Sequence, residues 1–166
     1  MTCEHIAEGG HLEVLEWARE HGCPWDEWTY AAAALGGHLD VLVWAWEHGC
    51  PLDGRTCTCA VHGGHLEVLV WAREHGCSWS HMLTCVHAAF RGHLDVLVWA
   101  QEHGCPWNER TCAEAAFGGQ LDVLVWAREH GCPWDQSTCA EAARGGHLEV
   151  LEWAHANGFP WVRGMD

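Results

Sequence analysis

Apolar and polar residues follow one another in a pattern that returns about every 27 residues along the chain. Each copy opens with a short stretch in which small residues such as Cys139 and Ala142 share one helical face. A second stretch, 38–48 in its copy, is apolar around most of its circumference and leaves a narrow stripe with Asp40 and Glu47 for water. The pattern predicts two α-helices in each copy, a short first helix and a buried second one.

The ends of these helices carry residues that suit helix termini. The first helix of each copy is expected to begin at a threonine whose hydroxyl caps the free backbone N–H groups. In two copies Glu114 and Glu141 follow three residues later, which is the spacing of a capping box. The second helix is expected to end at a glycine, as at Gly49, with Pro51 two residues further on. The threonines are Thr2, Thr29, Thr56, Thr84, Thr111 and Thr138.

A glycine in front of the second helix recurs at spacings of 27, 27, 28, 27 and 27 residues. A period of this length is typical of a solenoid, in which each unit buries its apolar faces against its neighbours. The sequence therefore predicts an all-α solenoid of six helix-turn-helix repeats in a single domain, residues 1–166. The repeats are expected at approximately 2–28, 29–55, 56–83, 84–110, 111–137 and 138–166.

The two end copies differ from the interior ones. Interior copies carry valine at one position of the second helix, as at Val43 and Val125, where the first and last copies carry Glu16 and Glu152. An end repeat turns one face to water, so these acids indicate partial caps. Met165 stands where a seventh threonine would begin a repeat, so a longer array is left open.

Composition narrows the class of protein. The chain has 166 residues, of which 49% are hydrophobic and 13 are tryptophan, and this excludes a disordered chain. Eight basic residues face 23 acidic ones, so the net charge of −15 would repel phosphate backbones and no nucleic-acid partner is expected. The longest apolar run, 41–46, is too short to span a bilayer, and no membrane partner is expected. The chain has 11 cysteines and no secretory signal. This combination indicates reduced thiols in an intracellular protein, cytoplasmic or nuclear.

The repeated phrase is clearest in the last copy, where Thr138–Ala154 reads TCAEAARGGHLEVLEWA. Within it, Ala142–Leu151 resembles the Ala-Ala-x-x-Gly-His-Leu-Glu-Val-Val core of the ankyrin repeat, and the match recurs in all six copies. The array also looks like the shortened ankyrin-type repeats of protists and large DNA viruses. The resemblance implies a curved stack of helix pairs that serves as a protein-binding scaffold without catalysis. No cofactor is expected.

Two features depart from that family. Ankyrin repeats have about 33 residues and open with Thr-Pro-Leu-His, whereas this period is 27 and the opening of the last copy reads Thr-Cys-Ala-Glu. The missing residues fall in the connection between repeats, where ankyrins place a β-hairpin. The segment 131–137 is too short for such a hairpin. The ankyrin partner-binding surface, which often includes these hairpins, is therefore the feature of the family that can least be assumed for this chain.

Positions that are the same in every copy are explained by the packing of one repeat on the next, whereas positions on the outward face that vary among the copies are not needed for that packing. Apolar side chains with arginines nearby are common anchors of protein interfaces. We therefore expect the chain to bind a protein partner through the outward face of the first helices and the inter-repeat connections, and we expect it to be a monomer. Alternatively, these positions vary only because they are exposed to solvent and have no role. The candidate residues are Trp28, Leu35, Arg55, Cys59, His62, Met82, His87, Phe90, Arg110, Phe117 and Arg144.

Cysteines and histidines recur in columns. Zinc sites need four converging ligands, and identical positions in stacked helices lie about 8–10 Å apart. Small buried thiols are therefore the favoured interpretation, with a metal-binding or redox-responsive array as the alternative. The histidines that flank the second helices are expected to bond turn carbonyls and to bridge repeats, with acid sensing as their alternative role.

The tryptophans recur too regularly to form a site and are expected in the core. The carboxylates of the second helices are expected to form a solvated acidic ridge. The sequence contains no P-loop, nucleophile elbow, HExxH or dinucleotide motif, so an enzyme is not expected.

Overall fold

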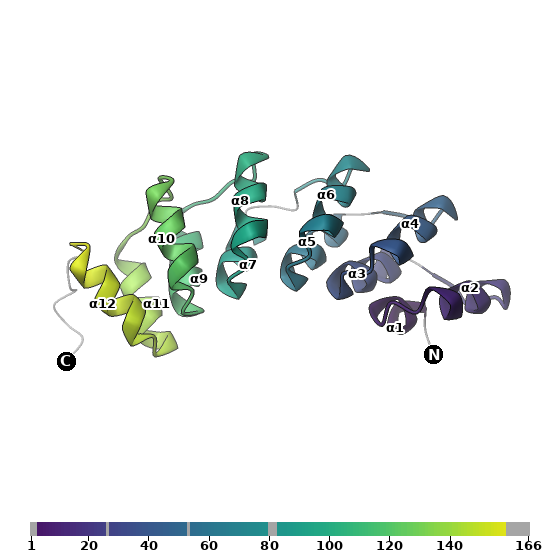
Figure 1. The fold of residues 1–166 in the computed structure, drawn as a ribbon, viewed down its shortest axis with the longest axis horizontal. Helices are drawn as coiled ribbons and strands as arrows, with labels where there is room; N and C mark the ends of the chain where they lie inside the picture. Colours follow the sequence, from purple (N-terminus) through teal and green to yellow (C-terminus); the bar gives the residue numbers. More distant parts are fainter. Residues whose placement is uncertain (1–2, 26, 53, 80–82, 159–166) are drawn as a thin grey trace. The chain divides into compact units, whose positions relative to one another are not determined.

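The computed structural model describes residues 3–25, 27–52, 54–79 and 83–158. Twelve α-helices lie in these ranges and alternate between a first and a second helix of each repeat, as predicted (Figure 1). They are α1 (Cys3–Glu8), α2 (Leu12–Glu20), α3 (Glu27–Gly36), α4 (Leu39–Glu47), α5 (Gly54–Gly63), α6 (Leu66–Glu74), α7 (Leu83–Arg91), α8 (Leu94–Glu102), α9 (Glu109–Phe117), α10 (Leu121–Glu129), α11 (Gln136–Gly145) and α12 (Leu148–Ala156).

The chain divides into two compact units, Met1–Thr84 and Cys85–Asp166. The division falls in the first turn of α7, just after the one-residue insertion that makes one spacing 28. In the first unit α3 packs between α1 and α5, and each of these helices also packs against the second helix of its own repeat. In the second unit α9 packs against α11 and α10, and α11 packs against α12. Each unit is thus a stack of helix pairs.

Five of the first helices, α3, α5, α7, α9 and α11, begin before their threonines, so the expected threonine caps are wrong there. In α9 and α11 the caps are Asn108 and Asp135, whose side chains accept hydrogen bonds from the backbone two residues on. Thr111 is fully buried in the first turn, where its hydroxyl accepts from the Asn108 N–H at 3.4 Å. Thr29, Thr56, Thr84 and Thr138 are also buried within their helices, and Thr2 lies outside the described residues.

The predicted capping boxes are wrong for the same reason. Because the helices start earlier, Glu114 and Glu141 lie a full turn inside them. There the Glu114 carboxylate pairs with Arg110 at 3.6 Å, and the Glu141 carboxylate pairs with Arg144 at 2.8 Å. These are partly exposed pairs along one helix, of the kind that stabilises a helix by a few tenths of a kcal/mol.

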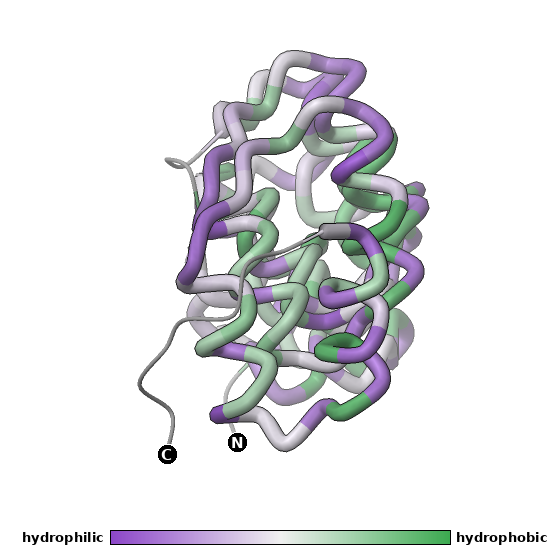
Figure 2. The backbone as a smooth tube through the Cα atoms, turned by 90° about the vertical axis from the view of Figure 1, so that its left-hand side faces the viewer, coloured by the Kyte–Doolittle hydropathy of each residue, from purple (hydrophilic) through white to green (hydrophobic). Residues whose placement is uncertain are grey.

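The second helices form the apolar interior that the sequence predicts. In α4, Val41, Leu42 and Ala45 are buried, and the equivalent residues of α6, α8 and α10 are buried too. Hydrophobic and hydrophilic stretches alternate along the backbone (Figure 2). Because the first helices of successive repeats pack against each other within each unit, each repeat completes its core against its neighbours.

Side chains at the start of the second helices bond the preceding repeat, which confirms the predicted bridging role of the histidines. In the first unit the Nε2 of His38 bonds the Glu8 carbonyl at 2.8 Å, and that of His65 bonds the Leu35 carbonyl at 3.0 Å. In the second unit the amide of Gln120 donates to the Phe90 carbonyl at 3.4 Å. Each bond satisfies a carbonyl at the end of a first helix, where no intrahelical donor remains.

The histidines that close the second helices bond within their own helix. His48 Nδ1 lies 2.7 Å from the Trp44 carbonyl, and its ring stacks on the Trp44 ring with centroids 4.4 Å apart. The same bond and stack recur at His21, His75, His103 and His130.

A substitution at His65 tests the bridge between repeats. We expect His65→Ala to lower the free energy of unfolding by about 1 kcal/mol, because the Leu35 carbonyl loses its protein donor. His65→Gln should lose less than half of that, since Gln120 donates to the corresponding carbonyl from the equivalent position. Urea unfolding followed by circular dichroism measures both. Equal losses for the two variants would show that the ring's packing, rather than its hydrogen bond, stabilises this position.

Candidate functional site

Three side chains of the second unit line up along its first helices. The rings of Phe90 on α7 and Phe117 on α9 stack with centroids 5.9 Å apart and planes inclined by 17°. The Arg144 guanidinium on α11 lies 4.5 Å from the centroid of the Phe117 ring. We call these three residues the first-helix row. Both rings are half-buried and Arg144 is exposed, so the row borders water.

Local geometry explains why the row forms. The last turn of α9 approaches α7 so closely that a Cβ at Gly118 would overlap the Phe90 carbonyl oxygen. The absence of a side chain at Gly118 lets the ends of the two helices touch, and this brings the Phe90 and Phe117 rings together. Arg144 completes the row while its guanidinium also pairs with Glu141. The row is an aromatic strip with a cation at one end, an arrangement that can bind an apolar side chain or an acidic group of a partner.

The described part of the first unit carries five candidate residues, of which Trp28 and Arg55 are in contact. The Arg55 guanidinium of α5 lies 4.3 Å from the Trp28 ring centroid, and the Trp28 side chain is 51% exposed. Leu35 is 38% exposed near the end of α3. Cys59 and His62 are half-buried on α5.

The structure therefore does not gather all the candidates into one site. Trp28 and Arg55 lie in the first turns of α3 and α5, whereas Leu35 is seven residues from Trp28, about 10 Å along the helix. Arg110 lies at the start of α9, where it pairs with Glu114, and Phe117 lies at the end. His87 is half-buried on α7, and Met82 lies outside the described residues.

The second helices carry a surface that the sequence did not predict. A groove of about 570 Å³ lies between α2 and α4, lined by Glu16, Arg19, Glu20, Trp25, Trp44 and His48. The Arg19 guanidinium lies 4.2 Å from the Trp25 centroid, and Trp25 meets Trp44 edge to face. The equivalent residues of α10 and α12 line a groove of about 300 Å³ in the second unit.

These grooves correct the expectation that the tryptophans form the core. Trp17 is 58% exposed and Trp46 is 43% exposed, while Trp44, Trp126 and Trp153 are half-buried. The core is built from smaller residues, Ala, Val, Leu and Cys, with Tyr30 as the one large aromatic side chain fully buried among the described residues. The tryptophans lie at the rim because their position, as at Trp44, is at the edge of the buried helix face formed by Val41, Leu42 and Ala45. The arginines and histidines that recur at the ends of these helices could have indicated that the tryptophans pair with polar side chains at the surface.

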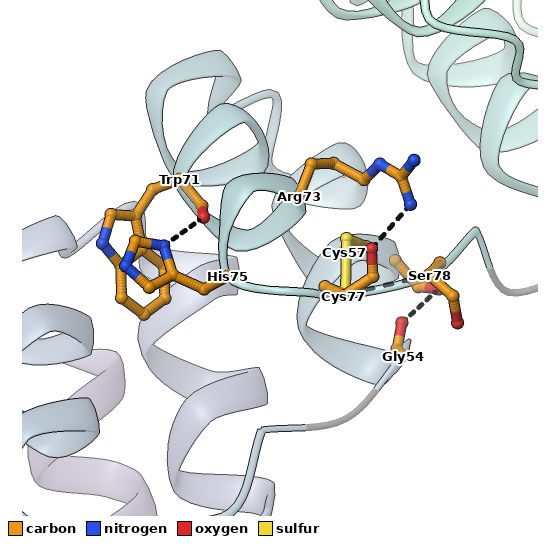
Figure 3. Close-up of a disulfide and its surroundings, with 8 residues drawn as sticks. Gly54, Cys57, Trp71, Arg73, His75, Cys77 and Ser78 are labelled. Carbon is orange, nitrogen blue, oxygen red and sulfur yellow. Dashed lines mark hydrogen bonds between the residues drawn. A yellow bond between two sulfur atoms is a disulfide. The ribbon is translucent and has the colours of Figure 1, made fainter.

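The cysteines correct a second expectation. Cys3 is bonded to Cys23 and Cys57 to Cys77 in disulfides, so the prediction of reduced thiols is wrong for these four residues. Figure 3 shows the Cys57–Cys77 bond, with the Arg73 guanidinium donating to the Cys77 carbonyl at 2.6 Å. The sequence argument compared identical positions in successive repeats, whereas the bonds join the two columns within one repeat.

The parts of the chain that are described hold no group of three or more histidine, cysteine or acidic side chains placed to bind a metal ion. Within those same parts, no helix is both long enough and apolar enough to cross a membrane.

The sequence matches no family model and no curated protein. The fold, in contrast, matches solved structures, with 84 chains showing significant similarity. One is the crystal structure of the human ASB11 ankyrin repeat domain, at 18% sequence identity and a TM-score of 0.75, covering 98% of this chain and 86% of that one. The predicted all-α, ankyrin-like repeat fold is thereby confirmed.

Proposed function

We propose that this chain is a non-catalytic scaffold that binds a partner protein through the outward side of its first helices. The observation that carries the proposal is the first-helix row, in which two stacked aromatic rings and an arginine border water on three successive first helices. Side chains of this kind supply most of the binding energy in protein interfaces. The ankyrin-like fold supports the proposal, because stacked repeats offer extended surfaces on rigid helices.

The row is not needed for the core of its unit. The buried positions of α9 are Thr111, Cys112, Ala113, Ala115 and Ala116, and Phe117 lies outside this set. The corresponding positions in other copies hold Glu8, Leu35, His62 and Arg144. The packing of the repeats therefore does not require one type of side chain at this position. Aromatic residues at such positions are therefore available for recognition.

The charges around the row indicate the chemistry of the partner. Glu114 and Glu141 lie on the same helices as the row, and the whole chain has a net charge of −15. A partner surface with an apolar patch and basic side chains at its rim complements both features. A phosphate backbone does not, because it would meet the acidic surface with like charge.

A double substitution tests this proposal. Phe90→Ser with Phe117→Ser should leave the helix content unchanged and weaken partner binding about 30-fold, the equivalent of about 2 kcal/mol. The measurement is capture of proteins from a lysate of the native host, followed by titration of the captured partner against both forms.

The matched control is Trp28→Ser, which removes an exposed ring from the first unit and spares the row. It should bind the partner as the unmodified chain does. If the double variant retains full affinity while Trp28→Ser loses it, the site lies at the start of α3 and α5. If both bind normally, the grooves of the second helices become the candidate surface.

A further inference from the structure

The two disulfides occupy the same place in their repeats. Each joins a cysteine near the start of the first helix to a cysteine in the connection after the second helix, at a sequence separation of 20. The Cα atoms of both pairs lie 6.4 Å apart, within the usual range for a disulfide. The connection thus folds back on the first helix of its own repeat.

Two further repeats place cysteines at the same two positions. In the fourth repeat the Cys85 thiol donates to the Cys105 carbonyl oxygen at 3.8 Å, and the Cys105 side chain lies close enough to the Cys85 thiol to shift its pKa. In the fifth repeat the Cys132 thiol donates to the Asn108 carbonyl oxygen at 3.5 Å, and the Cys132 side chain likewise lies close enough to the Cys112 thiol to shift its pKa. All four side chains are buried, so each thiol has its partner thiol as a neighbour in a site that water scarcely reaches.

We propose that Cys85–Cys105 and Cys112–Cys132 are two further disulfide sites, so that four of the six repeats are cross-linked at one position. This goes beyond the proposed scaffold function and does not depend on it. Each bond ties the first helix to the connection that follows the second helix and so holds both helices of a repeat in place. The cross-links restrict the unfolded chain and stabilise each repeat under oxidising conditions.

The oxidant is a low-molecular-weight disulfide, for which oxidised glutathione is the probe. The thiolate of one cysteine attacks a glutathione sulfur; a mixed disulfide forms, and one glutathione leaves as a thiolate that takes up a proton. The second cysteine gives up its proton, and its sulfur attacks the protein sulfur of the mixed disulfide, which releases the second glutathione. In total the pair loses two electrons and two protons, and glutathione disulfide becomes two thiols.

The surroundings of the two pairs differ in a way that sets their order of reaction. The hydrogen bond with Cys132 lowers the pKa of the Cys112 thiol, and the nearby Arg128 guanidinium adds to this, while burial opposes it. In the fourth repeat the hydrogen bond with Cys105, together with burial, raises the pKa of Cys85, and Gln101 stands where the fifth repeat has Arg128. Because the thiolate is the attacking species, Cys112 is the better nucleophile.

The remaining repeats provide internal controls. In the second repeat Tyr30 occupies the first-helix position opposite Cys50, and burial beside Cys50 raises the pKa of the Tyr30 hydroxyl. In the last repeat Phe159 takes the connection position in the sequence opposite Cys139. Neither repeat has two cysteines at the paired positions, and Cys59 lies in neither column.

The test is refolding of the full chain in a glutathione redox buffer. The chain is reduced and unfolded, refolded with reduced and oxidised glutathione, quenched with acid, alkylated and mapped by mass spectrometry. We expect four disulfides, each between cysteines 20 residues apart, and alkylation of Cys50, Cys59 and Cys139. When the reduced chain is instead oxidised in its folded state, the Cys112–Cys132 bond should form before the Cys85–Cys105 bond. The oxidised chain should also melt at a higher temperature than the reduced chain.

Two outcomes would overturn the proposal. One is alkylation of Cys85, Cys105, Cys112 and Cys132 in a sample that holds the Cys57–Cys77 bond. The other is disulfides between different repeats, or none at all. Neither outcome bears on the first-helix row, so failure here is distinguishable from failure of the scaffold function.

Two variants test whether the place of a cysteine in its repeat determines its disulfide partner. C132S should leave Cys112 open to alkylation and keep the other three bonds, without loss of helix content. Y30C should add a fifth disulfide, with Cys50, because it restores cysteine at the paired position. If Y30C folds and Cys50 is still alkylated, position in the repeat does not direct pairing and the argument fails.

Discussion

Leu124→Ala should lower the free energy of unfolding of the chain by about 2–5 kcal/mol. The Leu124 side chain is completely buried on α10, and leucine is equally buried at the same position of α2, α4, α6 and α8. Truncation removes apolar surface from the core and leaves a cavity that the surrounding helices cannot close. Chemical denaturation followed by far-ultraviolet circular dichroism measures the loss.

The matched control is Leu151→Ala, which changes the same position in the last repeat. Leu151 is only half-buried, because α12 lacks a following repeat among the described residues. Its truncation should therefore reduce the free energy of unfolding by less than half as much as Leu124→Ala does. A larger loss at Leu151 than at Leu124 would contradict the view that neighbouring repeats complete each other's core.

The repeat and its helices could be predicted from the sequence because both rest on local chemistry. A glycine at a fixed place in every copy, followed by a nearly continuous apolar stretch, determines where the second helix lies and which residues it buries. The predicted second helix, 38–48, differs from the observed Leu39–Glu47 by one residue at each end. Here the flanking His38 and His48 are the cap residues themselves.

The start of the first helix was harder to predict because several residues in a row can cap a helix. Asp135, Ser137 and Thr138 are all good cap residues by type, and the sequence pattern does not rank them. The structure selects Asp135 because the alternative would expose Thr138, which instead packs in the core with 0% of its surface exposed. Burial, a tertiary effect, overrides the local preference.

The candidate site was predicted in part. Comparison of the copies singled out Phe90, Phe117 and Arg144, and the structure brings these three into contact. The cysteine pairs and the grooves were not foreseen, because both depend on how the connection after the second helix folds back. That path is set by contacts such as the bond from the Arg73 guanidinium to the Cys77 carbonyl, which no periodicity reveals.

Gly37→Ala should destabilise the chain about as much as the truncation of a core leucine. Gly37 has a φ of +78°, which costs a residue with a side chain about 1–2 kcal/mol. In addition, a Cβ at Gly37 would lie 2.6 Å from Cε1 and 2.7 Å from Cγ of His65. Displacing that ring adds about 1–3 kcal/mol of overpacking, so we expect a total loss of about 2–5 kcal/mol in the free energy of unfolding.

Gly49→Ala separates the two contributions. Gly49 has nearly the same φ, +74°, but a Cβ there would meet nothing within 4 Å. It should therefore show the backbone cost of about 1–2 kcal/mol alone. The same urea titration measures both variants, and equal losses at Gly37 and Gly49 would mean that the His65 ring moves aside freely.

The double variant Gly37→Ala with His65→Ala then measures the coupling between the two positions. Removal of the ring should restore most of the overpacking energy, so the double variant should be more stable than the sum of the single losses predicts. Such coupling would show that the glycine recurs because the next repeat's histidine must pass over it to reach the Leu35 carbonyl. Additive losses would instead attribute the recurrence of the glycine to its backbone conformation alone.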